Sequence, residues 1–318
     1  MHFVEMVARE PFILFEGAVI ELLRRSPQIP LDPHVLHAGL VYDANHSAAL
    51  ADIYGSYIDI GRNHNLPMAI LTPTWRANPE RVALAKLGDV GDVNRDGYRF
   101  LASIRDRYGK YARRVWIGGL MGCKRDAYRP QEALSSPQAA RFHAPQARAL
   151  AEAGADFIMA ATLPAVSEAM GMATAIAETG LPYVLSFVVR PTGTLLDGTL
   201  LHRAIDNVDA SVDPRPLAYM INCVHPSVLE QALRSERVRS PRVHERLLGL
   251  QANTSAQAPE ELDNAEHLES QDPDTFADAM MRLHTELDIK ALGGCCGTDD
   301  RHIASIAHRA ATHLQTTP

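Results

Sequence analysis

The chain of 318 residues is 46% hydrophobic, which is enough to bury a large core and within the range of a single α/β barrel. Its formal charge of −7, scattered basic residues and 6% aromatic content argue against a nucleic-acid partner. No apolar run reaches the ~18–20 residues that cross a bilayer. Charged residues at positions 5, 9 and 10 interrupt any signal-peptide core, so we expect a cytoplasmic protein with no membrane partner.

Eight short apolar segments recur along the chain, and stretches with helical spacing follow them. The segments are 12–17, 68–74, 115–122, 156–162, 183–189, 218–224, 246–253 and 289–296. Nearly continuous apolar strands are typical of a parallel sheet that is covered on both faces. The pattern predicts an α/β protein with one domain over residues 1–318, a (β/α)8 TIM barrel.

The intervening stretches support this interpretation. Residues 140–155, 165–180 and 273–287 are rich in Ala, Leu, Met and Glu, as helices are. A doubly wound open sheet is the alternative, but no G-x-G-x-x-G motif follows a strand and opens a helix. We expect residues 28–47 to form a long loop or lid over one barrel end, and residues 255–274 to form an exposed acidic loop.

Three of the four cysteines lie where predicted strands end. Cys223 ends "AYMINC", and Cys295 and Cys296 end "IKALGGCC". In a barrel both strand ends lie on the C-terminal face, which carries the chemistry of such proteins. Neighbouring strand residues point to opposite faces, so adjacent cysteines share a target only where the strand breaks into a loop. The glycines on both sides of the pair permit the dihedral angles that such a break requires.

These thiols predict a metal site. Three thiolates leave one tetrahedral position of Zn²⁺ open, as catalytic zinc sites do, and soft sulfur ligands favour zinc over magnesium or calcium. Zinc would bind an incoming thiol as the thiolate, which then attacks an electrophilic carbon. The spacing alone fits a redox-active or incidental pair of cysteines equally well. In a reducing compartment a disulfide frame is not expected.

Two neighbouring residues have simpler explanations. Cys123 follows the third predicted strand, and a lone cysteine there is expected to be a small buried hydrophobic residue. His225 follows Cys223 by two positions and could be a fourth ligand, but a loop histidine of this kind more often has a structural role.

The two cysteine motifs together resemble a known signature. "INC" at 221–223 with "GGCC" at 293–296 is similar to the zinc motifs of the homocysteine S-methyltransferase family. Weaker similarity extends over 15–25, 182–201 and 249–253, and into a last helix that Thr298 is expected to N-cap. The resemblance implies that Cys223, Cys295 and Cys296 bind one Zn²⁺ on a (β/α)8 barrel, with no catalytic residue beyond the metal site.

The resemblance also implies a substrate pocket. Glu16 takes the place of the family's opening aspartate, and Ser186 and Asn253 are further pocket candidates. For these two, the alternative is a strand-end residue that caps local backbone groups. Ala161 stands where the family has a glutamate that binds the amino group of homocysteine. An ammonium there would lack a partner, so either Glu16 alone holds the amine or the substrate is a different thiol.

The implied function is zinc-dependent S-methyl transfer. The donor would be a small sulfonium of the S-methylmethionine or S-adenosylmethionine class, and the acceptor a zinc-activated thiol such as homocysteine, giving methionine. These two small molecules are the expected partners. The sequence is also compatible with a homo-oligomer. The alternatives are a zinc-thiolate methyltransferase or demethylase for another thiol or methylated metabolite, and a non-enzymatic zinc or redox sensor.

Overall fold

The computed structural model describes residues 1–258 and 270–316, with residues 236–239 described in their backbone only. Eight parallel strands close into a barrel in sequence order, and β8 pairs with β1. The sheet therefore has no free edge, and the predicted (β/α)8 barrel is confirmed. The strands are β1 (Ile13–Phe15), β2 (Met68–Leu71), β3 (Val115–Gly122), β4 (Phe157–Leu163), β5 (Tyr183–Phe187), β6 (Ala218–Val224), β7 (Leu247–Ala252) and β8 (Ala291–Gly294).

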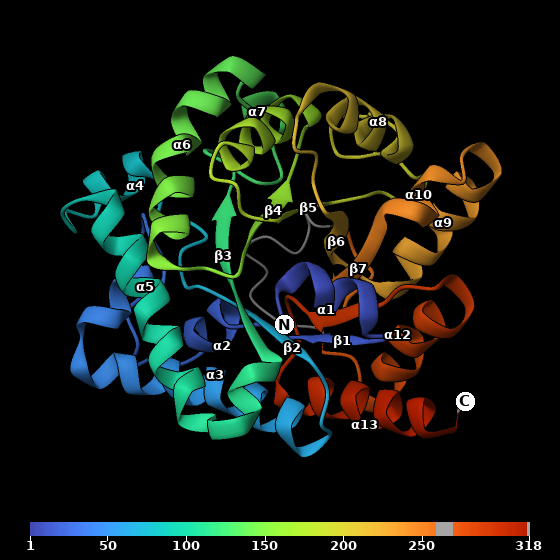
Figure 1. The fold of residues 1–318 in the computed structure, drawn as a ribbon, viewed down its shortest axis with the longest axis horizontal. Helices are drawn as coiled ribbons and strands as arrows, with labels where there is room; N and C mark the ends of the chain where they lie inside the picture. The colour runs from blue at the N-terminus through green and yellow to red at the C-terminus, as the bar shows by residue number, and fades with distance from the viewer. Residues whose placement is uncertain (259–269, 317–318) are drawn as a thin grey trace.

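Helices form a ring around these strands (Figure 1). The described part of the chain contains no helix that is both long and apolar enough to cross a membrane. The helices are α1 (Phe3–Arg9), α2 (Ile20–Arg24), η1 (Ala38–Tyr42), α3 (Ala44–Asn63), α4 (Pro79–Leu84), α5 (Val90–Arg105), η2 (Asp106–Arg114), η3 (Pro130–Glu132), α6 (Ser136–Ala153), α7 (Val166–Ala177), α8 (Leu201–Ser211), α9 (Pro226–Arg239), α10 (Arg242–Arg246), α12 (Pro273–Leu287) and α13 (Asp300–Thr316).

The strands are apolar because both of their faces are covered. Along β6, Tyr219 and Ile221 pack in the layer between the strands and the helices, whereas Ala218 and Met220 pack inside the barrel. Successive side chains on a strand point to opposite faces, so every position of such a strand must be buried. Each large side chain in these layers contributes about 1.5–3 kcal/mol of burial free energy.

Helix α1 covers the N-terminal end of the barrel, where it lies across the strands close to the N-terminus (Figure 1). Its Phe3 stacks on Phe157 at the start of β4, with ring centroids 3.8 Å apart and planes 6° apart. The Trp116 indole N–H donates to the Met1 carbonyl at 3.3 Å. This end is filled with side chains, which leaves the opposite, C-terminal end for a site.

Several details of the sequence prediction change in the structure. The first, second, fifth, seventh and eighth strands are shorter than the apolar runs, and β8 ends at Gly294, before the two cysteines. Within 28–47 the chain forms a tight turn at 32–36, then η1 and the start of α3. Most of the acidic loop expected at 255–274 lies outside the described residues.

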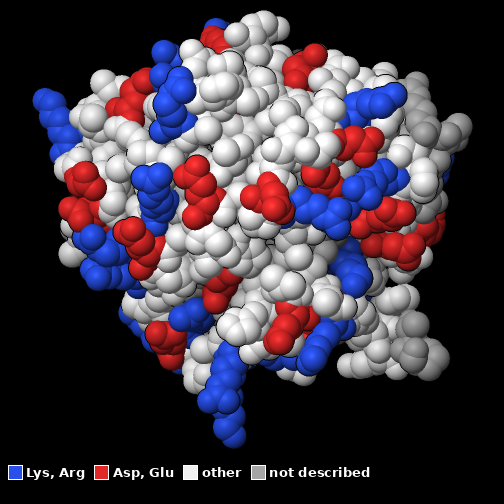
Figure 2. Space-filling model, turned by 45° about the horizontal axis from the view of Figure 1, so that its top comes forward, with Lys and Arg blue, Asp and Glu red and all other residues white. Residues whose placement is uncertain are grey.

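The charge distribution on the face in Figure 2 is mixed, with basic and acidic side chains interspersed rather than gathered by sign. A duplex-binding surface would gather Lys and Arg in one patch or stripe. This face offers no such patch.

Candidate metal centre

Three sulfur atoms gather at the C-terminal end of the barrel. The Sγ atoms of Cys223, Cys295 and Cys296 all lie within 4.8 Å of one another. Those of Cys223 and Cys295 are 2.8 Å apart, and all three cysteines are free thiols. Within the ranges 1–258 and 270–316, no other group of three or more potential metal ligands is this close. The strand ends of β6 and β8 therefore meet as the sequence predicted.

The backbone of β6 turns Cys223 toward this point. Cys223 has a φ of +57°, and the pairing of β6 with β7 shifts register between Asn222 and Val224. A non-glycine residue in this region costs about 1–2 kcal/mol, so it persists only where its surroundings hold it. A bulge of this kind redirects a side chain at the end of a strand.

The Asn222 amide holds the Cys223 conformation. Its Nδ2 donates to Cys223 Sγ at 3.1 Å and to Thr162 Oγ1 at 2.7 Å. Its Oδ1 accepts from Thr162 N at 3.0 Å and from Ser186 Oγ at 2.6 Å. Thr162 likewise has a positive φ, +60°, where the pairing of β4 with β5 shifts register. One buried amide therefore couples the ends of β4, β5 and β6 to the sulfur cluster.

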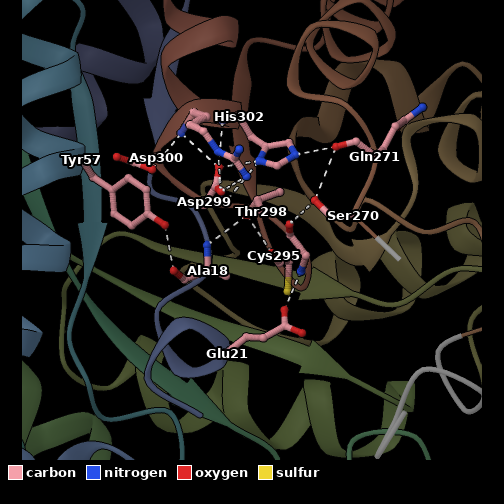
Figure 3. A network of polar contacts seen from close by, with 12 residues as sticks. Ala18, Glu21, Tyr57, Ser270, Gln271, Cys295, Thr298, Asp299, Asp300 and His302 are labelled. Atoms are coloured by element: carbon pink, nitrogen blue, oxygen red, sulfur yellow. Dashed lines mark hydrogen bonds and ion pairs between the residues drawn. The ribbon is translucent and has the colours of Figure 1, made fainter. Parts of the chain in front are cut away.

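The turn that carries the other two cysteines is held from both sides, and Figure 3 shows Glu21, Ala18 and Thr298 around it. On the β7 side, Cys295 N donates to Ala252 O at 2.7 Å, and Thr254 N donates to Cys296 O at 3.1 Å. On the β1 side, a Glu21 carboxylate oxygen accepts from the backbone N–H of residue 297. Strand β8 therefore breaks between its two neighbours, which lets consecutive side chains face one centre.

Thr298 and the glycines complete this turn. The Thr298 hydroxyl donates to Cys295 O at 2.7 Å and accepts from Ala18 N at 3.0 Å. Gly297 has a φ of +89°, and a Cβ there would lie 1.8 Å from Thr254 Oγ1. A side chain at this position would both strain the backbone and clash.

The expectation that Thr298 caps the last helix is wrong. Helix α13 begins at Asp300, and the Asp299 carboxylate accepts from the backbone N–H groups of Arg301 and His302 at 3.0 and 3.3 Å. Thr298 lies one residue too early and uses its hydroxyl inside the cysteine turn. Asp299 is the N-cap.

The thiols of the cluster are electrostatically coupled. Hydrogen bonds from Cys295 and Cys296 lower the pKa of Cys223 well below its usual value, against the effect of burial, and Asn222 and Tyr128 add to this. Interaction with Cys223 is the largest cause that raises the pKa values of Cys295 and Cys296. One negative charge is favoured on the cluster, and a divalent cation is what would let all three thiols ionise. The donor set thus fits a soft divalent metal such as zinc.

A cavity of about 580 Å³ opens beside the cysteines, within the range of small-molecule sites. It includes Tyr128, which contributes to the lowered pKa of Cys223. It also includes Trp75, whose indole N–H donates to the Ala161 carbonyl at 3.3 Å. Residues of the expected lid form part of its wall, namely Pro33, Leu36 and His37.

The three predicted substrate residues lie in different places. Glu16 lines the cavity, and its Oε2 accepts from Leu71 N at 3.0 Å. Burial raises the pKa of Glu16 well above its usual value, against that hydrogen bond. Ser186 and Asn253 are buried and are not among the residues that line the cavity. Ser186 supports Asn222, whereas Asn253 Oδ1 has no hydrogen-bond partner in the described part of the chain.

The two residues with simpler explanations lie outside the sulfur cluster. Cys123 is buried, its thiol contacts Arg125 O at 3.5 Å, and burial raises its pKa to about 12. His225 uses Nδ1 with Ser227 Oγ at 2.7 Å and Nε2 with Gln271 Oε1 at 3.0 Å. Both ring nitrogens form hydrogen bonds with neighbouring side chains, as expected of a loop histidine with a structural role.

Sequence reasoning missed two residues of the site. Asn222 stands in the "INC" motif, so the motif itself carried the signal, but a polar residue inside an apolar strand was not given a role. Tyr128 lies in the loop after β3, far in sequence from both cysteine motifs, and nothing in its local sequence marks it. Only the closed barrel brings that loop to the cysteines.

A closed (β/α)8 barrel that gathers three thiols beside a ligand-sized cavity at the C-terminal ends of its strands defines a protein of the TIM-barrel class with a cysteine cluster that could hold a metal. The family model described as homocysteine S-methyltransferase matches residues 13–310. The chain therefore belongs to the homocysteine S-methyltransferase family and is a methyltransferase.

Solved structures agree on the fold. The homocysteine methyltransferase MmuM from Escherichia coli is similar in its metallated form, with a TM-score of 0.76, 20% identity and coverage of 96% of this chain and 98% of that one. Its oxidized form has a TM-score of 0.77 at 20% identity, and its apo form has a TM-score of 0.67 at 19% identity. Both cover the same shares of the two chains. No curated protein sequence matches the chain.

Proposed function

We propose that this protein is a zinc-dependent S-methyltransferase. It would transfer a methyl group from a small sulfonium donor, of the S-methylmethionine or S-adenosylmethionine class, to a thiol such as homocysteine, giving methionine. Cys223, Cys295 and Cys296 would hold the metal. The observation that carries the proposal is their convergence at the wall of one cavity, within 4.8 Å of one another.

The donor set suits an open zinc site. Bound zinc would supply the positive charge that keeps an incoming thiol deprotonated and nucleophilic near neutral pH. The metallated form of the Escherichia coli methyltransferase, which shares this fold, supports a metal in this protein as well.

The chain's own residues would position the reactants. Asn222 orients Cys223, while Glu21 and Thr298 hold the turn at Cys295 and Cys296. Glu16 faces the cavity with one oxygen committed to Leu71 N, so the other is available to a substrate polar group. Alignment of the two reactants is the main contribution that the protein makes to a displacement of this kind.

The displacement itself needs little proton transfer. The acceptor thiol releases its proton to solvent before attack, and its sulfur forms the new bond to the methyl carbon. The carbon–sulfur bond of the sulfonium breaks, and its electron pair stays on the donor sulfur. The donor leaves as a neutral thioether. The reaction therefore needs no general acid at the leaving group.

Cysteine variants test the proposal. We expect Cys223→Ser and Cys295→Ser each to lose stoichiometric zinc and methyl transfer to homocysteine, with unchanged circular dichroism. Cys123→Ser is the matched control and should keep both, because Cys123 is a buried residue outside the cluster. Zinc content and methionine formed from S-methylmethionine or S-adenosylmethionine are the two readouts.

The outcomes separate the alternatives. Full activity in either ligand variant refutes the assignment of the metal ligands. Stoichiometric zinc in the wild type without transfer to any thiol favours a sensor. No zinc in the wild type favours redox chemistry of the cysteine pair.

A further inference from the structure

The cavity beside the cysteines contains charged side chains of both signs, and most of the acidic ones already form ion pairs. Glu21 lies 3.3 Å from Arg25 and also accepts from the backbone of residue 297. Asp126 and Glu132 lie 3.5 and 3.4 Å from Arg129, which does not line the cavity. Three of the four cavity carboxylates therefore have cationic partners outside the cavity.

The arginines of the cavity are not engaged in this way. Arg24, Arg76, Arg81 and Arg125 all line it. Among the residues that the structure describes, none of these four guanidinium groups forms an ion pair with a carboxylate. The wall therefore carries an excess of unpaired positive charge.

Arg76 lies in the loop after β2, Arg81 on α4 and Arg125 in the loop after β3, and neutral groups hold the side chains of Arg76 and Arg81. Arg76 lies over the Trp75 ring, with its Cζ 4.1 Å from the centroid, and donates to the Arg125 carbonyl. Arg81 donates to the His34 carbonyl at 3.0 Å, while its Nε is buried without a partner in the described chain. Burial, and then the charge of Arg76, lower the pKa of Arg81.

Like charges gathered at one wall repel one another, which costs free energy unless an anion neutralises them. Guanidinium groups match carboxylates in geometry and bind them through paired hydrogen bonds.

His37 lies in the same wall, 2% exposed, with Nδ1 buried and unpartnered among the described residues. Burial lowers the pKa of His37 to about 3, so this ring is a neutral hydrogen-bonding group.

The same wall offers little to an ammonium group. Glu16 is the remaining cavity carboxyl, and one of its oxygens accepts from Leu71 N. From the end of β4 the wall includes Ala161 and Thr162, neither of which carries a charge. Recognition of a charged amine would require a free carboxylate that the rest of the wall does not supply.

We propose that the cavity selects its acceptor thiol by an anionic group, a carboxylate bound by Arg76, Arg81 and Arg125, and that it does not require an ammonium group. This inference rests on the proposed function, because it places the thiol end of the same molecule at the cysteines. Homocysteine meets the requirement through its carboxylate alone. The substrate class is therefore the carboxylate-bearing thiols.

Three matched thiols test the inference. Homocysteine carries both charged groups, 4-mercaptobutanoate is the same molecule without the amine, and 3-mercaptopropylamine is the same molecule without the carboxylate. Their S-methyl derivatives are methionine, 4-(methylthio)butanoate and 3-(methylthio)propylamine. The methylated set has no thiol to coordinate, so its binding to metal-free protein by calorimetry reports on the charged wall alone.

We expect 4-(methylthio)butanoate to bind metal-free protein at least as tightly as methionine, and 3-(methylthio)propylamine to bind at least about tenfold more weakly, as the loss of a charged hydrogen-bonded pair implies. Arg81→Gln and Arg76→Gln should each weaken binding of 4-(methylthio)butanoate by about tenfold. Arg148→Gln, which removes an exposed charge on α6 outside the cavity, should change nothing.

Tighter binding of methionine than of 4-(methylthio)butanoate by tenfold or more would overturn the inference, because it would show that an ammonium is recognised. Equal affinity of the amine probe, absence of saturable binding by both carboxylates, or unchanged affinity in both arginine variants would overturn it too. With zinc-loaded protein the three thiols then serve as acceptors. Failure of zinc binding or methyl transfer there removes the proposed function but leaves the selectivity measured on metal-free protein.

Discussion

At the residue scale, the site depends on one side-chain amide as much as on the sulfurs. Asn222 makes four hydrogen bonds that join Cys223, Thr162 and Ser186. Both Cys223 and Thr162 have positive φ values, +57° and +60°. These backbone conformations are unfavourable for non-glycine residues, and the buried amide network is what compensates for them.

Asn222→Ala is therefore expected to weaken zinc binding by about 10–100-fold, the usual effect of removing a group that orients a metal ligand. Competition with a chromophoric chelator measures the affinity directly. Asn63→Ala, at the exposed end of α3, is the control and should match the wild type. A wild-type affinity in Asn222→Ala would show that Cys223 holds its orientation without the amide.

The three cysteines could be identified from the sequence, but the residues that support them could not. Cys223, Cys295 and Cys296 were visible because they stand at the ends of apolar runs, and such ends converge in any parallel barrel. Asn222 and Tyr128 were not, since the contacts they make depend on register shifts and on loop paths. Those features follow from tertiary packing and leave no periodic pattern.

At the element scale, a buried carboxylate on α7 holds the loop that carries Arg125 and Tyr128. Glu168 accepts from Lys124 N at 2.7 Å, from Leu134 N at 3.2 Å and from His143 Nε2 at 2.9 Å. Burial would raise its pKa, but these hydrogen bonds outweigh burial and hold the pKa below its usual value. The two ends of the loop are thus attached to one side chain.

Because the folded pKa of Glu168 is depressed, its stabilising effect is present above the unfolded value, about 4.3, and is lost as pH falls through the lower folded pKa. We expect Glu168→Gln to destabilise the protein by about 1–3 kcal/mol at pH 7. The difference from wild type should shrink as the pH is lowered below 4. Urea unfolding at several pH values measures both effects.

Glu178→Gln is the matched control. Glu178 is the exposed C-cap residue of the same helix and lies 3.5 Å from Arg148, a surface pair that is worth little. It should leave stability nearly unchanged at every pH. A Glu168→Gln variant as stable as this control at pH 7 would show that the loop is held by other contacts.

At the scale of the whole molecule, the two ends of the barrel have different roles. Helix α1 fills the N-terminal end, with Phe3 stacked on Phe157, and the strand ends at the other face carry the cysteines and the cavity. The eight strands were predictable because continuous apolar runs are needed wherever both faces of a sheet are buried.

The cavity wall was less predictable. Arg76 and Arg81 follow β2 and Arg125 follows β3, so they are distant in sequence from both cysteine motifs. Charged residues in loops and short helices are usually solvated, and their sequence gives no indication that they face a common cavity. Barrel closure places these segments around the same opening as the three cysteines.

X-ray absorption at the zinc edge, on protein loaded with one equivalent of Zn²⁺, tests the central claim most directly. Three sulfur atoms at about 2.3 Å from the metal are predicted, with one lighter atom in the fourth position. Addition of a carboxylate-bearing thiol should raise the sulfur count to four. Fewer than three sulfur atoms bound to the zinc, or a sulfur count that does not change when the thiol is added, would contradict the account.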